Sequence, residues 1–322
     1  MPRRPYLAGI AATAIALGVL ASAPASGDEP TVSHPRVVAH FDFTAGETPE
    51  NIALEPDGSA DLTFAFARQV ANVTRHGNVR SRVTLPAVAD PNTPLVHNAL
   101  VLGIARAHDG TLYVTYATGT SETGIWRIKP HGGRPHQIVK LPPNGLPNGL
   151  ALDEHRGVLY AADSALGVVW RAPVTGGRRT AWATTKALRP VPSGTGFGAN
   201  GIKVHDGAVW VSNTDRGTLL RIPVRRNGSA GRTSVRATGL DGIDDFAFTS
   251  RHGDTVLATV NTANQVVVVR PKGTHSVVLT QQDGLANPTS VAVRDHTVYV
   301  PSASYFAPEP DPNLLLARLN RG

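Results

Sequence analysis

A short phrase recurs six times along the chain, and this repeat limits the possible folds more than any other sequence feature. Its clearest copies are PNGLALD at 147–153 and ANGIKVH at 199–205. The other copies are PENIALE at 49–55, VLGIARA at 101–107, IDDFAFT at 243–249 and PTSVAVR at 288–294. The second residues of successive copies lie 44 to 52 residues apart. A period of this length, with room for several strands, is typical of a β-propeller.

Each copy of the phrase is followed by a turn and by further short apolar runs. The second runs are TLYVTY at 111–116, VLYAAD at 158–163, AVWVSN at 208–213, TVLATV at 255–260 and TVYVPS at 297–302. A small sheet of this kind cannot bury both of its faces alone, so neighbouring units must stack. The 32 glycines and 25 prolines suit the many tight turns between such strands. The sequence therefore predicts an all-β, six-bladed propeller with almost no helix.

The segment RVVAHFDF at 36–43 precedes the first unit and has no partner within it. We predict that it pairs with the last blade, because joining the two chain ends removes an exposed sheet edge. Residues 36–322 then form one propeller domain, preceded by a flexible segment at 26–35.

The first 25 residues combine a basic start, the apolar run LAGIAATAIALGVL and a small-residue site at Ala23-Pro24-Ala25. This pattern predicts a signal peptide cleaved after Ala25, since the apolar run is too short to cross a bilayer. We expect a secreted, soluble protein, exported by the general route or, given Arg3-Arg4, by the twin-arginine route. The chain has no cysteine, so its stability must come from core packing or bound ions.

The net charge of +7 comes from lysines and arginines that are scattered along the chain. Basic clusters such as RRNG at 225–228 are short and are not interleaved with aromatic residues, which disfavours nucleic-acid binding. The expected partner is a small molecule, and no membrane contact is expected once the signal is removed. A closed propeller leaves no free strand edge, so we expect a monomer.

The second position of the phrase is predicted to point into the central channel, because the first strand of every blade lines it. Across the six units this ring reads Glu50, Leu102, Asn148, Asn200, Asp244 and Thr289. Four members carry a carboxylate or amide oxygen, and burying such groups unpaired costs about 1–3 kcal/mol each. Oxygen donors without thiolate or histidine favour Ca²⁺, although another divalent cation is possible. Alternatively, these residues only cap the turns at the strand starts.

The second strand of each blade should end beside the phrase, at the same mouth of the channel. Tyr116, Asp163 and Asn213 are therefore candidates for substrate contact, whereas Asp215 and Asn261 fit turn caps better. Two long loops, at 183–198 and 303–313, are predicted to cover that mouth, or to be surface insertions.

The phrases PENIAL, PNGLALD with LYAADS, ANGI and GIDDFAF resemble the regucalcin and gluconolactonase (senescence-marker-protein) family of six-bladed propellers. The resemblance covers roughly residues 36–320. It implies one channel metal, commonly Ca²⁺, held by Glu50, Asn200 and Asp244, with Asn148 at the substrate, and lactone hydrolysis as the activity. The chain departs from the family pattern at Asn51-Ile52 and Asp245 and shows no arginine suited to a sugar acid.

These observations predict a calcium-dependent hydrolase of lactones or related esters, with Asp244 as the catalytic base. A secreted propeller that binds a ligand or a protein, with a structural metal and no chemistry, is the alternative. A third reading is a strictosidine-synthase-like condensing enzyme, which would need a glutamate near the end of the fold. Glu309 is the local candidate for that role.

Overall fold

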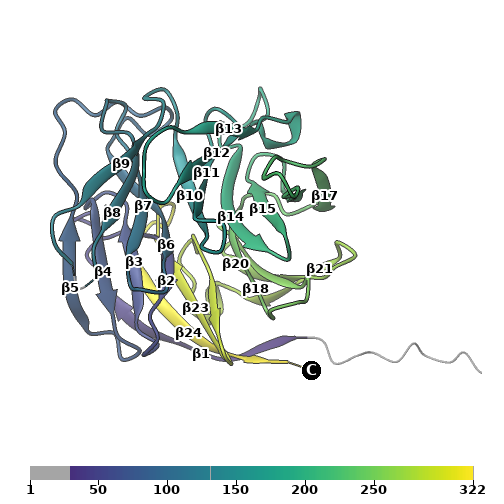
Figure 1. Ribbon diagram of the computed structural model, residues 1–322. Helices are drawn as coiled ribbons and strands as arrows, with labels where there is room; N and C mark the ends of the chain where they lie inside the picture. The colour runs from purple at the N-terminus through teal and green to yellow at the C-terminus, as the bar shows by residue number, and fades with distance from the viewer. Residues whose placement is uncertain (1–29, 131, 322) are drawn as a thin grey trace, which may run out of the picture.

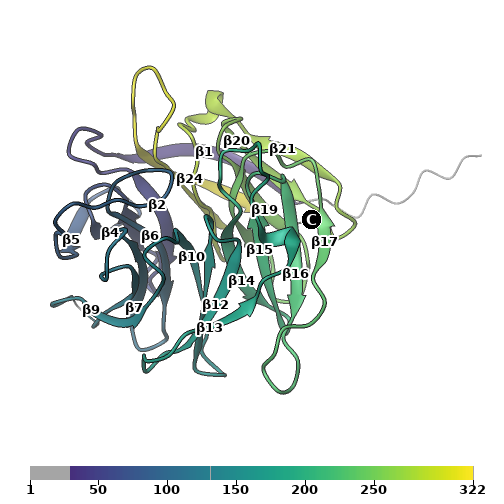
Figure 2. The ribbon, with the colours of Figure 1, turned by 90° about the horizontal axis from the view of Figure 1, so that it is seen from above.

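The computed structural model describes residues 30–130 and 132–321, which form six antiparallel sheets of four strands each. In Figure 1 the inner strands β2, β6, β10, β14 and β18 surround the middle of the molecule, while β5, β9, β13 and β17 lie at its rim. Figure 2 shows the same order from above. The predicted six-bladed propeller is confirmed. The predicted signal peptide at 1–25 lies outside the described residues.

The first five blades each use four consecutive strands. Blade 1 comprises β2 Pro49–Leu54, β3 Ala60–Phe64, β4 Gln69–Val73 and β5 Val79–Thr84. Blade 2 comprises β6 Leu100–Arg106, β7 Leu112–Ala117, β8 Gly124–Ile128 and β9 His136–Lys140. Blade 3 comprises β10 Pro147–Asp153, β11 Val158–Asp163, β12 Val168–Pro173 and β13 Thr180–Ala183. Blade 4 comprises β14 Ala199–His205, β15 Ala208–Asn213, β16 Thr218–Pro223 and β17 Ser234–Ala237. Blade 5 comprises β18 Ile243–Phe248, β19 Val256–Val260, β20 Gln265–Val269 and β21 His275–Leu279.

The sixth blade joins the two ends of the chain. Its strands are β22 Ala292–Arg294, β23 Thr297–Ser302, β24 Asn313–Asn320 and the N-terminal β1 Thr31–His40. β1 pairs antiparallel with β24, from Thr31 opposite Asn320 to His40 opposite Asn313, and Figure 1 shows the purple and yellow strands side by side. The predicted closure is confirmed. The strand begins at Thr31, so residues 31–35 of the segment predicted to be flexible are part of the sheet.

The outer strands of the blades were not predicted, whereas the predicted near absence of helix is confirmed. Each of the first five blades carries a fourth, outer strand where the sequence indicated only turns. The only helices in the described part of the chain are two short 3₁₀ turns, η1 Lys186–Leu188 and η2 Gln281–Asp283. None of the described helices is long and apolar enough to span a membrane.

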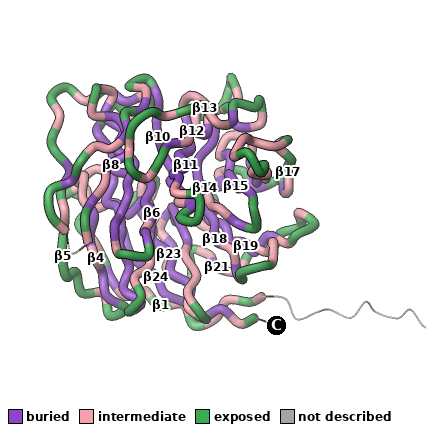
Figure 3. Tube along the Cα trace, in the orientation of Figure 1, coloured by how far each residue is buried: buried purple, intermediate pink, exposed green. Residues whose placement is uncertain are grey.

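The core lies between neighbouring blades, where the apolar faces of the sheets meet (Figure 3). One cluster joins Tyr160 and Val169 of blade 3 to Ile202 and Val211 of blade 4. Another joins Trp210 of blade 4 to blade 5. Each blade therefore buries its faces only against its neighbours, as the repeat required.

The phrase forms a bulge in the inner strand of the first five blades. Pairing between β14 and β15, for example, skips from Ala199 opposite Asn213 to Ile202 opposite Val211. The skipped residues are the second and third of the phrase, as they are in β6, β10 and β18. The shift in β2 skips only Glu50, and Asn51 pairs with Thr63. A bulge re-aims the side chains that it contains. The repeated phrase therefore encodes a repeated bulge that faces the channel.

Small residues at the third position let the inner strands approach one another. A Cβ on Gly149 would lie 2.4 Å from the carbonyl oxygen of Asn200 in the next blade. A Cβ on Gly103 would likewise lie 2.4 Å from the carbonyl oxygen of Asn148. Real Cβ atoms do not tolerate such contacts, so only glycine fits at these two positions.

Hydroxyl groups in the middle of the second strands link each bulge to the next blade. Thr115 Oγ1 accepts a hydrogen bond from Gly103 N at 2.7 Å and donates one to Asn148 O at 2.6 Å. Thr63, Ser212 and Thr259 make the corresponding pairs of bonds in blades 1, 4 and 5. The backbone groups that the bulges expose are thus satisfied within the protein.

Candidate functional site

The four oxygen-bearing members of the predicted ring lie in the bulges and are all buried. Glu50, Asn148, Asn200 and Asp244 are 4–9% exposed. We call these four residues the channel ring. Asn200 Nδ2 donates to Thr214 Oγ1 at 2.9 Å, which fixes the amide. The structure thus buries all four side chains at equivalent positions of the repeat, and their role as ligands stays a prediction.

The two carboxylates of the channel ring oppose each other electrostatically. Burial raises the pKa of Asp244 well above its usual range, and the charges of Glu50 and Asp245 raise it further. A hydrogen bond from Asn200 acts in the opposite direction. Burial likewise raises the pKa of Glu50 to about 7. Such shifts mean that the folded protein disfavours two negative charges at this site unless a proton or a cation neutralises them.

Tyr305 completes the channel ring from a loop that the sequence analysis treated only as a cover. Its Oη donates to Glu50 Oε2 at 2.7 Å, and its ring contacts Phe66 edge-on. Burial and the Glu50 carboxylate together raise the pKa of Tyr305 well above its usual range, so the phenol stays a donor. The sequence signal that could have identified Tyr305 is an aromatic residue with a polar tip inside a proline-rich loop.

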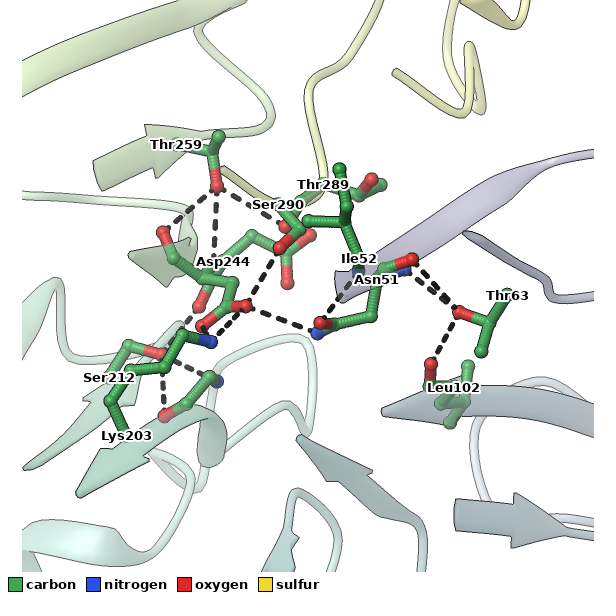
Figure 4. A network of polar contacts seen from close by, with 12 residues as sticks. Asn51, Ile52, Thr63, Leu102, Lys203, Ser212, Asp244, Thr259, Thr289 and Ser290 are labelled. Atoms are coloured by element: carbon green, nitrogen blue, oxygen red, sulfur yellow. Dashed lines mark hydrogen bonds and ion pairs between the residues drawn. The ribbon is translucent and has the colours of Figure 1, made fainter. Parts of the chain in front are cut away.

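A second set of polar side chains, centred on the Asp245 carboxylate, lies next to the channel ring. The Asp245 carboxylate accepts hydrogen bonds from Asn51 Nδ2 at 3.1 Å and Ser290 Oγ at 2.8 Å. Lys203 Nζ lies 2.7 Å and 2.6 Å from its two oxygens. Figure 4 shows Asn51, Lys203 and Ser290 converging from separate blades. We call these four residues the axial cluster.

The axial cluster explains why the chain departs from the family pattern at Asn51 and Asp245. The third position of the phrase is glycine in blades 2, 3 and 4 but Asn51, Asp245 and Ser290 in the others. Asn51 and Ser290 both donate to the Asp245 carboxylate, and Lys203 supplies the matching positive charge. A single buried network therefore replaces glycines and joins blades 1, 4, 5 and 6.

The side chains at the two remaining ring positions, Leu102 and Thr289, are not candidate metal ligands. Leu102 is buried and offers only its carbonyl, which accepts from Thr63. Thr289 donates its hydroxyl to Pro49 O at 2.8 Å. Both residues thus support the backbone of neighbouring blades.

The three second-strand candidates have polar groups that are already hydrogen-bonded. Tyr116 Oη donates to Pro86 O at 2.7 Å. Asp163 Oδ2 accepts from an indole N–H of its own blade at 3.0 Å. Asn213 Nδ2 donates to two carbonyls of the loop at 183–198. The structure does not join these residues to the channel ring, and their role in substrate binding stays a prediction.

The two predicted covers are anchored differently. Asp215 accepts hydrogen bonds from the backbone of the 183–198 loop, at Val191, Thr195 and Gly196, which agrees with the capping role predicted for it. The 303–313 loop instead sends Tyr305 into the channel. Glu309, at the tip of that loop, is exposed.

The opposite end of the channel is open. A cavity of about 590 Å³ is lined by residues of all six inner strands, including Leu54, Leu152, Phe248 and, from the axial cluster, Lys203. The channel therefore has two distinct ends. One carries the channel ring and Tyr305, and the other is a recess lined by both apolar and charged side chains, among them Arg106, Glu154 and Lys203.

The donor set of the channel ring fits a calcium ion. It supplies carboxylate and amide oxygens at one level, without histidine or thiolate. The nearby ammonium of Lys203 is held by Asp245, so the charges of Glu50 and Asp244 lack a salt-bridge partner among the described residues. A divalent cation held by Glu50, Asn200 and Asp244 would offset the burial and the carboxylate repulsion that raise the pKa values of the two acids.

Comparison with known proteins identifies the fold. No family model matches the chain, and neither does any curated protein sequence. Among solved structures, a calcium-binding regucalcin from Agrobacterium tumefaciens matches with a TM-score of 0.64 and 16% identity, over 90% of this chain and 95% of that one. A candidate gluconolactonase matches with a TM-score of 0.64 and 17% identity, over 89% and 92%.

A luciferin-regenerating enzyme also matches, with a TM-score of 0.63 and 12% identity, over 88% of this chain and 95% of that one. All three neighbours are propellers of the predicted kind, and they are consistent with the resemblance found in the sequence. At these identities the comparisons establish the fold.

Proposed function

We propose that the protein is a secreted, calcium-dependent hydrolase of lactones or related esters that acts at the channel ring. The observation that carries this proposal is the pair of buried carboxylates, Glu50 and Asp244, that lacks a cationic partner of its own. The fold supports it further, since regucalcin and a gluconolactonase candidate have similar structures.

The chain's own residues take distinct parts in this proposal. Glu50, Asn200 and Asp244 hold the ion, and Tyr305 fixes the orientation of the Glu50 carboxylate. Asn148 lies at the same level and offers an amide to the substrate. When bound, Ca²⁺ supplies a Lewis acid for the carbonyl oxygen of the ester.

Asp244 is the proposed general base. One of its carboxylate oxygens would accept a proton from the attacking water, while the other would bind the ion. Two hydrogen bonds keep Asp244 in position. The Asn200 amide bonds to its side chain, and Ser212 Oγ donates to its backbone carbonyl. General bases contribute roughly 10²- to 10⁴-fold to a rate.

The first experiment is a calorimetric Ca²⁺ titration of the chelator-treated protein, followed by a calcium-dependent screen of lactones and esters. We expect one Ca²⁺ per chain in the wild type, and loss of both binding and turnover, by at least about 100-fold in rate, in Asp244→Asn. Asp241→Asn is the matched control, because Asp241 is exposed and lies three residues earlier, in the turn that precedes β18. Wild-type turnover in Asp244→Asn would overturn the assignment.

The recess at the open end of the channel favours a second candidate function. A cavity of about 590 Å³ behind the axial cluster could hold a ligand far from any reacting group. In that case the protein would be a binding propeller with a structural ion. Calcium binding without turnover of any lactone or ester would support this candidate.

A further inference from the structure

Three metal-binding side chains meet at the open end of the channel, away from the channel ring. His205 ends β14, Asp206 begins the turn that follows, and Asp254 lies in the loop between β18 and β19 of the next blade. One ligand atom of each residue lies within 4.8 Å of the others. Asn200 precedes His205 by five residues on the same strand, which separates the two sites by roughly 16 Å.

His205 is buried without a partner for one of its ring nitrogens. Its side chain is 8% exposed, and it stacks on Phe248 with 3.6 Å between ring centroids. Nε2 has no hydrogen-bond partner, although Asp206 Oδ2 and Asp254 Oδ1 face it at 3.6 Å and 3.9 Å. These distances are too long for hydrogen bonds. A buried imidazole nitrogen aimed between two carboxylates is the arrangement that a bound cation would satisfy.

The spacing of the three atoms suits coordination by one ion. Zinc binds histidine nitrogen and carboxylate oxygen at about 2.0–2.2 Å, so tetrahedral ligand atoms lie about 3.4 Å apart. The observed separations of 3.6 Å and 3.9 Å from Nε2 are close to that value. Small side-chain rotations of the two aspartates, which lie at the surface, would close the difference.

Two further side chains bear on a cation bound here: His252 is a candidate fourth ligand, and Arg236 offsets part of the negative charge of Asp254. His252 Nδ1 lies 3.6 Å from Asp206 Oδ1 and is highly exposed, so it is free to turn toward the ion. Arg236 Nη2 lies 3.5 Å from Asp254 Oδ2, which leaves Oδ1 of that carboxylate facing His205. The site would thus contain imidazole and carboxylate ligands, a mixture that favours zinc and similar transition metals over calcium.

We propose that His205, Asp206 and Asp254, with His252 as a fourth ligand, bind a transition-metal dication of the zinc type. The ion would tie the β14–β15 turn of blade 4 to the β18–β19 loop of blade 5. This loop is longer than the two-residue turn of blade 4 and carries both His252 and Asp254. The inference does not depend on the proposed hydrolase activity, since it concerns a different end of the channel.

The test is a ZnCl₂ titration of the chelator-treated protein in buffer with excess Ca²⁺, which occupies the channel ring. We expect one Zn²⁺ per chain in the wild type. His205→Gln and Asp254→Asn should each weaken it at least about 10-fold. His296→Gln is the matched control, because His296 follows Asp295 in the corresponding turn of blade 6 but its Nδ1 already faces a backbone carbonyl. Zinc should also raise the thermal midpoint of the wild type and not that of His205→Gln.

Three outcomes would overturn the proposal. The first is wild-type zinc affinity in both His205→Gln and Asp254→Asn. The second is an equal loss in His296→Gln, which would mean that zinc binds surface histidines without preference. The third is loss of zinc binding in Asp244→Asn but not in His205→Gln, which would place the ion in the channel ring. Asp254→Asn guards against a folding defect, because Asp254 is partly exposed and lies in a loop.

Discussion

Asp244 and Asp245 are adjacent in one bulge and both are buried, yet the fold treats their charges differently. Asp245 receives the Lys203 ammonium at both oxygens, together with hydrogen bonds from Asn51 and Ser290. Asp244 has no such countercharge, and burial together with the nearby Glu50 carboxylate raises its pKa. The axial cluster is therefore a charge network that the protein completes itself, whereas the channel ring, under the proposed function, takes a cation from solution. The contrast distinguishes an aspartate with a countercharge inside the protein from one that we propose to bind an ion.

The largest expected effect comes from removing the cation of the axial cluster. Lys203→Met leaves the Asp245 carboxylate, whose side chain is 2% exposed, without its countercharge. Loss of one partner of a buried ion pair costs about 3–5 kcal/mol of unfolding free energy, measured by urea unfolding. The exposed Lys272 provides the control, since Lys272→Met should leave the unfolding free energy unchanged. A neutral Lys203→Met would show that Asp245 does not depend on its countercharge, and the contrast with Asp244 would fail.

Removing a charge from the channel ring should have the opposite sign. Because the pKa of Glu50 is raised from 4.5 to about 7, the folded state favours the protonated acid. Its contribution to stability is complete below about pH 4.5 and is lost as the pH rises through 7. Without calcium, Glu50→Gln should therefore exceed the wild type in unfolding free energy by roughly 3 kcal/mol at pH 8, and by almost nothing at pH 4.

The measurement for Glu50→Gln is urea unfolding of both proteins with a chelator at pH 4, 6 and 8. The Gln side chain can still accept the hydrogen bond of Tyr305, so the difference reports the charge. A difference that stays constant with pH would mean that Glu50 is not held in its protonated form. Added Ca²⁺ should reverse the order of stability at pH 8, because only the wild type keeps both anionic ligands.

Tyr305→Phe should have a smaller effect that is confined to binding. The phenol stabilises the charged form of Glu50, and a hydrogen bond to a charged group contributes about 1.5–3 kcal/mol. We expect Ca²⁺ affinity at pH 7 to fall about 10-fold by calorimetry. Phe306→Ala tests the same loop without touching the channel, since Phe306 is 68% exposed. Equal affinities for Tyr305→Phe and the wild type would remove Tyr305 from the site.

Most of the fold could be predicted because the elements that matter repeat. The phrase and the second strands carry strong apolar patterns at a regular period. The pairing of the N-terminal segment with the last blade was predictable because that blade would otherwise have an exposed sheet edge. The outer strands were missed, since segments such as SVRA at 234–237 are short and largely exposed. They are held by pairing to the strand inside them rather than by burial, so periodicity gives little signal.

The channel ring could be predicted for the same reason, since equivalent positions of a repeat meet at one level. The contacts of single residues could not. Tyr305 reaches Glu50 across 255 positions of sequence. Lys203 pairs with Asp245 because β14 and β18 are neighbouring inner strands. A lysine at the fifth position of the phrase is long enough to reach back along the channel to the third position of the next blade. In the sequence Asp245 is only a departure from the family pattern next to the proposed ligand Asp244. In the structure its carboxylate pairs with Lys203.

The smallest predicted effects concern the hydroxyls that support the two aspartates from behind. Ser212 Oγ bonds to the carbonyl of Asp244 and to Gly201 N, and Thr259 Oγ1 accepts from Asp245 N at 3.2 Å. Ser212→Ala and Thr259→Val each leave buried backbone groups unsatisfied, so each should lower the unfolding free energy by about 1–2 kcal/mol. Only Ser212→Ala should also weaken Ca²⁺ binding, by a few-fold, because it releases the backbone of a ligand. If Thr259→Val weakened Ca²⁺ binding as much, the channel ring and the axial cluster would be one coupled unit and not two.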